Sequence, residues 1–291
     1  MRLIDIFSIV FAYVLVGISY VIVLYGLDYF QPLTLIALRL TMIAAILVPF
    51  NLRVKTFPWK KVFIFGFINA LGFQSLTVMA MYFGLDIATS VIAQQMHIPF
   101  SCIIGVLLLS EKLSNKTIIG LIIAFTGLVI MVGNPKLASN YGPVAMAIVS
   151  AFLYTISNFI SKSIRNFNAL SVIGYGALFA LPFQYLLAYF VEGFNFKYVM
   201  NAPLSAWMSV FFLAVGVSIV SLSIWIEMLK KYPVQLVTPF SLLGPITGII
   251  CSMIILGEDI NNYILIGTIL TIAGISLIII KFKILKFKFF K

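Results

Sequence analysis

The chain has 291 residues, of which 63% are hydrophobic and 9% are charged, with a formal net charge of +11. Soluble domains carry roughly 25% charged residues, so this chain has too little polar surface to fold as a soluble globule. Apolar runs of about 20 residues recur along it, which predicts an all-α polytopic membrane protein. Both cysteines lie inside apolar runs and the chain has a single histidine, so we expect no disulfide framework, no metal site and no cofactor.

The hydropathy pattern predicts ten membrane-spanning helices joined by short loops. The first begins shortly after Arg2 and is too long for a signal peptide, so we expect it to be retained as a helix. The length and uniform apolarity of the runs exclude β-barrel strands. The predicted spans cover residues 6–27, 32–50, 62–84, 87–109, 117–133, 142–162, 169–190, 204–229, 234–256 and 263–281.

Lysine and arginine are distributed unevenly between the two sides of this arrangement. Most of them lie in the loops on the side of the N-terminus, whereas the loops on the other side hold Lys136 and Lys197. Because cytoplasmic loops are enriched in basic residues, we expect both termini in the cytoplasm. The net positive charge thus reflects topology rather than nucleic-acid binding. We expect the basic tail, residues 283–291, to anchor the last helix at the cytoplasmic lipid surface.

The chain also repeats itself at an offset of 147 residues. Three residues of the first half correspond at this offset to three of the second, namely Glu111 to Glu258, Gly120 to Gly267 and Gly127 to Gly274. This self-similarity predicts two five-helix repeats, residues 1–134 and 141–282. Because five is an odd number, the repeats must face opposite ways. Inverted repeats are typical of secondary transporters, whose binding site lies near the midplane where the repeats meet.

The fourth predicted span carries Gln94, Gln95 and His97 deep inside an apolar run. An ionisable residue at that depth indicates function, and the ordinary pKa of histidine suits proton coupling. A neutral histidine hydrogen-bonded across helices is the alternative. Gln94 precedes His97 by three residues and is expected on the same helix face. The two amides could hold a zwitterionic substrate or act as links between helices.

The eighth and ninth spans supply a second set of candidates. Ser218, Ser221 and Trp225 have the spacing of one helical stripe, on which Trp225 either packs or covers an amine through a cation–π contact. Proline removes a backbone donor, so we expect helix breaks, with freed carbonyls, at Pro99, Pro239 and Pro245. The remaining polar candidates for a substrate site are Ser19, Tyr20, Asn69, Gln74, Tyr154, Ser157, Asn158, Thr238 and Ser241.

Charged residues near the span ends have simpler expected roles. Arg39 lies about 10 Å along the second span, where a structural ion pair, with Asp28 or Asp86 as possible partners, or snorkelling to the interface is favoured over attraction of an anion. Glu111 and Glu258 are expected to cap helices. Glu227 is expected to pair with Lys230, three residues further on.

Several motifs together resemble the EamA family of the drug/metabolite transporter superfamily, and the likeness covers nearly the whole chain. The first half contains P-x-x-L-x-x-x-R-L from Pro32, then S-E-K-L; the second contains S-I-W, V-T-P-F-S-L-L-G-P-I-T-G and G-E-D-I. The nearest likeness is to bacterial exporters of amino acids and cysteine-pathway metabolites. The resemblance implies a ten-helix inner-membrane carrier driven by a proton or substrate gradient, with a central cavity lined by helices 1, 3, 4, 6, 8 and 9. His97 departs from the small, apolar or amide residue common at that position in the family.

We therefore expect a secondary transporter, not an enzyme, that moves amino acids or related small polar metabolites by alternating access, with export favoured. Its partners would be the substrate, the lipid bilayer and a coupling proton, and its state a monomer or dimer. A drug-cation carrier would need a carboxylate at mid-depth, and a carrier of nucleotide-linked solutes would need more basic residues than Arg39. An intramembrane enzyme and a non-transporting membrane protein are the remaining alternatives.

Overall fold

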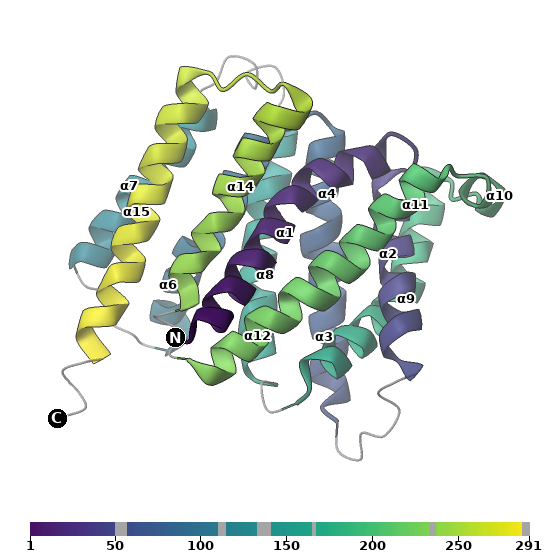
Figure 1. Ribbon diagram of the computed structural model, residues 1–291, viewed down its shortest axis with the longest axis horizontal. Coiled ribbons are helices and arrows are strands. Elements are labelled where there is room, and N and C mark those ends of the chain that lie inside the picture. The colour runs from purple at the N-terminus through teal and green to yellow at the C-terminus, as the bar shows by residue number, and fades with distance from the viewer. Residues whose placement is uncertain (50–56, 110–114, 133–140, 165–166, 233–236, 287–291) are drawn as a thin grey trace.

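The computed structural model describes residues 1–49, 57–109, 115–132, 141–164, 167–232 and 237–286, and every regular element among them is helical (Figure 1). In the first half the elements are α1 (Leu3–Leu27), α2 (Pro32–Leu47), α3 (Trp59–Phe67), η2 (Ile68–Gln74), α4 (Ser75–Tyr82), α5 (Ile87–Gln94), α6 (His97–Leu109) and α7 (Asn115–Val132). In the second half they are α8 (Gly142–Lys162), α9 (Ala169–Glu192), α10 (Phe196–Met200), α11 (Leu204–Phe211), η3 (Phe212–Ser221), α12 (Leu222–Lys231), η4 (Thr238–Leu242), α14 (Leu243–Cys251), η5 (Ser252–Leu256) and α15 (Asn262–Lys286).

Six helical segments are long and apolar enough to cross a membrane. They cover residues 3–27, 59–82, 87–105, 142–161, 169–192 and 204–228. Four shorter apolar helices cover residues 32–47, 115–131, 240–256 and 262–278, so each of the ten predicted spans falls on helical structure. Two differences are local. The short helix α10 occupies the loop after α9, and α15 continues to Lys286, five residues beyond the predicted end of its span.

Two of the long helices contain π-helical segments at related positions. Residues 68–74 form η2, and the corresponding residues at the offset of 147, 215–221, lie within η3. A π-helical turn leaves backbone carbonyls that need other donors. In each segment a serine hydroxyl donates to the carbonyl five residues before it. Ser75 donates to the Ala70 carbonyl at 3.0 Å, and Ser221 donates to the Gly216 carbonyl at 2.8 Å.

The helix formed by α5 and α6 is interrupted at Gln95 and Met96, four residues before a proline. Pro99 has no N–H to offer the Gln95 carbonyl, and the Ile98 N–H bonds that carbonyl at 3.0 Å instead. The second half is irregular at the matching place, where the 3₁₀-helix η4 precedes α14. Pro245 is the third residue of α14, as Pro99 is the third of α6.

The helices α7 and α15 pack side by side through two pairs of glycines (Figure 1). A Cβ atom on Gly120 would lie 2.8 Å from the Gly274 carbonyl oxygen, and one on Gly127 would lie 2.6 Å from the Gly267 carbonyl oxygen. Small residues permit this close backbone approach between membrane helices. Since low numbers on one helix face high numbers on the other, the two helices run antiparallel. The start of α1 and the end of α15 lie at the same lower end of Figure 1.

Candidate functional site

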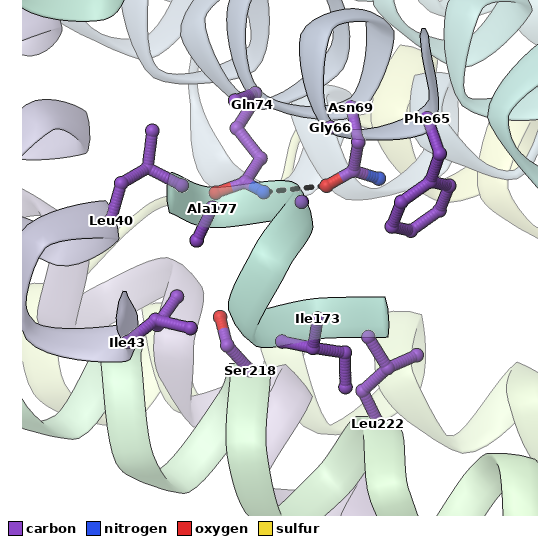
Figure 2. Close-up of a pocket in the computed structure, with 12 residues that line it drawn as sticks. Leu40, Ile43, Phe65, Gly66, Asn69, Gln74, Ile173, Ala177, Ser218 and Leu222 are labelled. Atoms are coloured by element: carbon purple, nitrogen blue, oxygen red, sulfur yellow. Dashed lines mark hydrogen bonds between the residues drawn. The ribbon is translucent and has the colours of Figure 1, made fainter. Parts of the chain in front are cut away.

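A cavity of about 40 Å³ lies between helices from both halves of the chain. Its lining comes from α2, α3 and η2 of the first half and from α9, η3 and α12 of the second; the polar members are Asn69, Gln74 and Ser218. Figure 2 shows Asn69 and Gln74 on one side of the cavity and Ser218 on the opposite side. A volume of this size holds a water molecule or a small polar group.

The amides of the cavity are oriented by a chain of hydrogen bonds. The Gln74 Nε2 atom donates to Asn69 Oδ1 at 2.7 Å, and Asn69 Nδ2 donates to the Ser157 hydroxyl on α8 at 3.2 Å. This direction of donation leaves the Gln74 Oε1 atom buried and without a partner. Of the predicted site residues, the structure thus brings Asn69, Gln74 and Ser157 together.

The opposite wall of the cavity adjoins Arg39. Its Nε and Nη2 atoms donate to the Ser218 hydroxyl at 3.1 and 2.8 Å, and Ser218 donates to the Leu213 carbonyl. The prediction that Arg39 pairs with Asp28 or Asp86 is wrong, because among the described residues neither carboxylate lies within ion-pair distance of it. Asp86 instead caps α5 through the Thr89 N–H and hydroxyl. Asp28 is exposed after α1, and the Asp86 carboxylate is used at the start of α5.

Gln94 belongs to a second buried group, centred on α8. Its Nε2 atom donates to the Thr77 hydroxyl at 2.9 Å and to the Ser150 hydroxyl at 2.6 Å. Ser150 and Ser157 are seven residues apart, so the polar side of α8 extends about 10 Å from the Gln94 group to the cavity amides. We call this pair of Ser150 and Ser157 the α8 polar seam.

His97 contacts α8 at Thr155, on a different face from the α8 polar seam. Its Nδ1 atom lies 2.8 Å from the Gln94 carbonyl oxygen, which the helix interruption has freed, and the Thr155 hydroxyl donates to the His97 carbonyl at 3.2 Å. A carbonyl only accepts, so Nδ1 carries the proton of the neutral ring and Nε2 is left as the acceptor. The expected pairing of side chains on one face is not found, because His97 contacts the backbone of Gln94 and the Gln94 amide points to Thr77 and Ser150.

Aromatic rings enclose the interior beside His97. The His97 ring meets Tyr154 edge-on, with ring centroids 5.1 Å apart, and Tyr13 meets Trp225 in the same way at 5.5 Å. Tyr20, also on α1, lies beside α14, where a Cβ atom on Gly248 would be 3.6 Å from its ring. Trp225 therefore faces α1, whereas Ser218 contacts Arg39 of α2, and the expected single stripe on the eighth span is split. A π-helical turn shifts the register on which that spacing depends.

The other predicted residues have varied surroundings. Ser19 and Ser221 donate to carbonyls of their own helices, Gln95 has a buried Oε1 atom without a partner, and Asn158 is exposed. Ser241 is buried on η4. The side chains of Thr238, Pro239 and Lys230, and the whole of Glu111, lie outside the described residues. Glu258 acts as an N-terminal cap, as predicted, because its Oε1 atom accepts the Ile87 N–H of α5 at 3.1 Å.

Three polar residues that connect helices were not predicted. Glu192 caps α2, and Gln184 is fully buried, donating to the Leu33 carbonyl and the Ser75 hydroxyl. Asp5, buried at the start of α1, accepts from the Tyr232 hydroxyl at 2.6 Å and from Arg2 Nε at 3.0 Å, with Lys231 Nζ at 3.7 Å. For Gln184 the available signal was an amide inside an apolar run, whereas Asp5 and Glu192 lie just outside the predicted spans 6–27 and 169–190.

A cavity with a few polar side chains, lying between helices from both halves of an all-helical membrane protein, is typical of membrane transporters. No group of three metal-ligating side chains occurs in the part of the chain that the structure describes. The model of the EamA-like transporter family matches residues 3–133 and 142–280, and the chain belongs to this family of multi-pass membrane transporters, which are not enzymes.

Relatives of known sequence extend over most of the chain. A protein named "Probable amino-acid metabolite efflux pump" from Salmonella typhimurium is 25% identical over 280 residues and covers 92% of each chain. One of the same name from Escherichia coli is 22% identical over 267 residues, with 89% of each chain covered. A solved crystal structure covers 92% of this chain and 94% of its own at a TM-score of 0.62 and 16% identity, so the fold is shared.

Proposed function

We propose that the protein is a secondary transporter that moves amino acids or closely related small polar metabolites across the bacterial inner membrane by alternating access. The cavity carries the proposal, because it lies between helices of both halves and its mostly apolar lining includes the polar side chains of Asn69, Gln74 and Ser218. The names of the relatives from Salmonella and Escherichia support amino-acid metabolites as substrates and export as the direction.

The two halves, residues 1–134 and 141–282, would act as inverted five-helix repeats in a ten-helix protein with both termini in the cytoplasm. The glycine contacts support this symmetry. Gly120 meets Gly274, which is the counterpart of Gly127, and Gly127 meets Gly267, which is the counterpart of Gly120. Such self-complementary contacts between equivalent, antiparallel helices are those expected across a two-fold axis.

Alternating access requires contacts between the halves to break at one end while they form at the other. The Asp5 group joins α1 of the first half to the end of α12 in the second. We assign it the role of a closure at the cytoplasmic end, which separates when the cavity opens to that side.

His97 is the coupling candidate. Its ring is half-buried against Tyr154, and the hydrogen bond from Nδ1 to the Gln94 carbonyl leaves Nε2 as the proton acceptor. Carriers of organic cations and of nucleotide-linked solutes are the alternatives. The positive charge of Arg39 beside the cavity disfavours the first, and a volume of about 40 Å³ disfavours the second.

Purified protein in sealed proteoliposomes tests the function. We expect saturable uptake of at least one member of a labelled L-amino-acid panel, stimulated by an imposed pH gradient. His97→Gln should retain uptake but lose the stimulation, whereas Ser101→Ala, whose hydroxyl only bonds the His97 carbonyl, should retain both. Absence of uptake of every panel member by the wild type would contradict the amino-acid assignment. Full gradient stimulation in His97→Gln would limit that residue to packing.

A further inference from the structure

Arg39 is a cation inside the helical bundle without an acidic partner among the described residues. It is partly buried, and the contacts it makes there are two hydrogen bonds to one neutral hydroxyl, that of Ser218. A guanidinium has five N–H donors in a planar fork that matches a carboxylate. A charged group at membrane depth costs free energy unless it is paired. The presence of Arg39 there therefore indicates a negatively charged partner during part of the transport cycle.

The opposite side of the cavity, formed by Asn69 and Gln74, needs a hydrogen-bond donor. The Gln74 Oε1 atom is buried and accepts no hydrogen bond, and the donation from Gln74 to Asn69 and on to Ser157 fixes the amide in that orientation. An unpaired acceptor in a low-dielectric interior is destabilising unless a donor reaches it. An ammonium group is such a donor, and a neutral amide oxygen binds it without burying a second charge.

On this basis we propose that the cavity binds the head group of a zwitterionic α-amino acid, with Arg39 and Ser218 at its carboxylate and Gln74 at its ammonium. The proposal rests on the proposed transport function and specifies its substrate class. The cavity would admit the small charged head group, and the side chain of the substrate would lie outside it. A permanent cation would be repelled by Arg39, and a simple carboxylic acid would leave the Gln74 oxygen without a hydrogen-bond donor. A zwitterion pairs with both groups.

The first test uses the wild type alone, so that it does not depend on the folding of a variant. Competition against uptake of the best amino acid from the panel would compare the free amino acid with its carboxamide, its N-acetyl derivative and acetate. We expect the carboxamide and the N-acetyl derivative each to compete at least about tenfold more weakly than the free amino acid. Equal competition by the carboxamide would overturn the role of Arg39, and equal competition by the N-acetyl derivative would overturn the role of Gln74.

The second test assigns the two ends to residues. Arg39→Gln should raise the KM for the free amino acid at least about tenfold and abolish its advantage over the carboxamide, and Arg39→Lys should restore part of it. Gln74→Leu should instead abolish the advantage over the N-acetyl derivative. Thr41→Ala, on the exposed face of α2, is the matched control and should leave both ratios unchanged.

The outcomes separate this proposal from the broader one. If the wild type transports amino acids and Arg39→Gln has an unchanged KM and an unchanged carboxamide ratio, the head-group site is wrong and the transport function stands. If the wild type transports none of the panel, the amino-acid function and the head-group site are both wrong. Competition by acetate as strong as by the free amino acid would replace the zwitterion by a simple anion.

Discussion

Thr34 in the first turn of α2 donates both its backbone N–H and its hydroxyl to the Glu192 Oε2 atom, each at 2.9 Å, although the two residues are 158 positions apart. The other oxygen of Glu192 accepts the Leu33 N–H at 2.6 Å. The residue before α2, Gln31, provides no side-chain cap, so a carboxylate from the end of α9 supplies it. This bond fixes α2, and with it Arg39, against the second half of the chain.

Replacing Glu192 by alanine should lower the stability of the protein by about 1–3 kcal/mol, because three donors at a helix N-terminus lose a charged acceptor. Glu192→Gln, which keeps one acceptor oxygen, should lose less. Unfolding in mixed detergent micelles measures both, with Asp259→Ala at an exposed position as control. Equal stability of Glu192→Ala and the wild type would show that water replaces the cap.

Adding bulk at Gly127 should separate α7 from α15. A leucine there must displace the backbone carbonyl of Gly267 and the buried Thr271. We therefore expect the free energy of unfolding to fall by roughly 1–3 kcal/mol, or the chain to fail to insert into the membrane. The control is Ala273→Leu, which adds a similar volume on the exposed face of α15. Thermal denaturation in detergent compares the two variants, and similar melting temperatures would exclude tight packing at this glycine.

Gln94 and Ser150 should be energetically coupled, because the Gln94 Nε2 atom donates to the Ser150 hydroxyl at 2.6 Å in a buried site. Gln94→Met and Ser150→Ala should each lower the free energy of unfolding. The double variant should lose about 0.5–1 kcal/mol less than the sum of the two single losses. A double-mutant cycle of unfolding free energies measures the difference. Thr126→Ala, at an exposed hydroxyl, serves in place of Ser150→Ala as the uncoupled control. Strict additivity of Gln94→Met and Ser150→Ala would rule out the bond.

The Asp5 group should limit access to the interior from the end of the protein where the chain begins. Asp5→Asn removes the ion pairs with Arg2 and Lys231 and should favour the state open at that end. In a Cys102→Ala, Cys251→Ala background, the interior residue Gly244→Cys would report opening through its rate of reaction with a membrane-impermeant thiol reagent. We expect a severalfold faster reaction in Asp5→Asn, and Asp28→Asn, at an exposed position, should not change it. A slower or equal rate in Asp5→Asn would remove the closure role.

Much of the architecture could be predicted because its signals are local. Each predicted span coincides with helical structure, since hydropathy over about 20 residues reports the lipid environment directly. The capping role of Glu258 also followed from its place at a helix end. The partner of Arg39 was missed, because the nearest carboxylates in a linear count, Asp28 and Asp86, are not its neighbours in space. The predicted stripe from Ser218 to Trp225 is split because residue spacing in the sequence does not reveal a π-helical turn.

By itself the sequence determined that this is an all-helical membrane protein, because composition and span length do not depend on how the helices meet. Only the tertiary structure decided which polar groups meet. It placed a cavity between α2, η2, α9 and η3; η2 and η3 belong to the third and eighth predicted spans, which the family resemblance implied, whereas α2 and α9 belong to the second and seventh, which it did not. It also placed Ser218 against Arg39, left the Gln74 oxygen unpaired and aligned Gln94 and His97 with α8. These contacts join residues far apart in the chain, and the helix crossings and π-helical turns that set them follow from packing over the whole bundle.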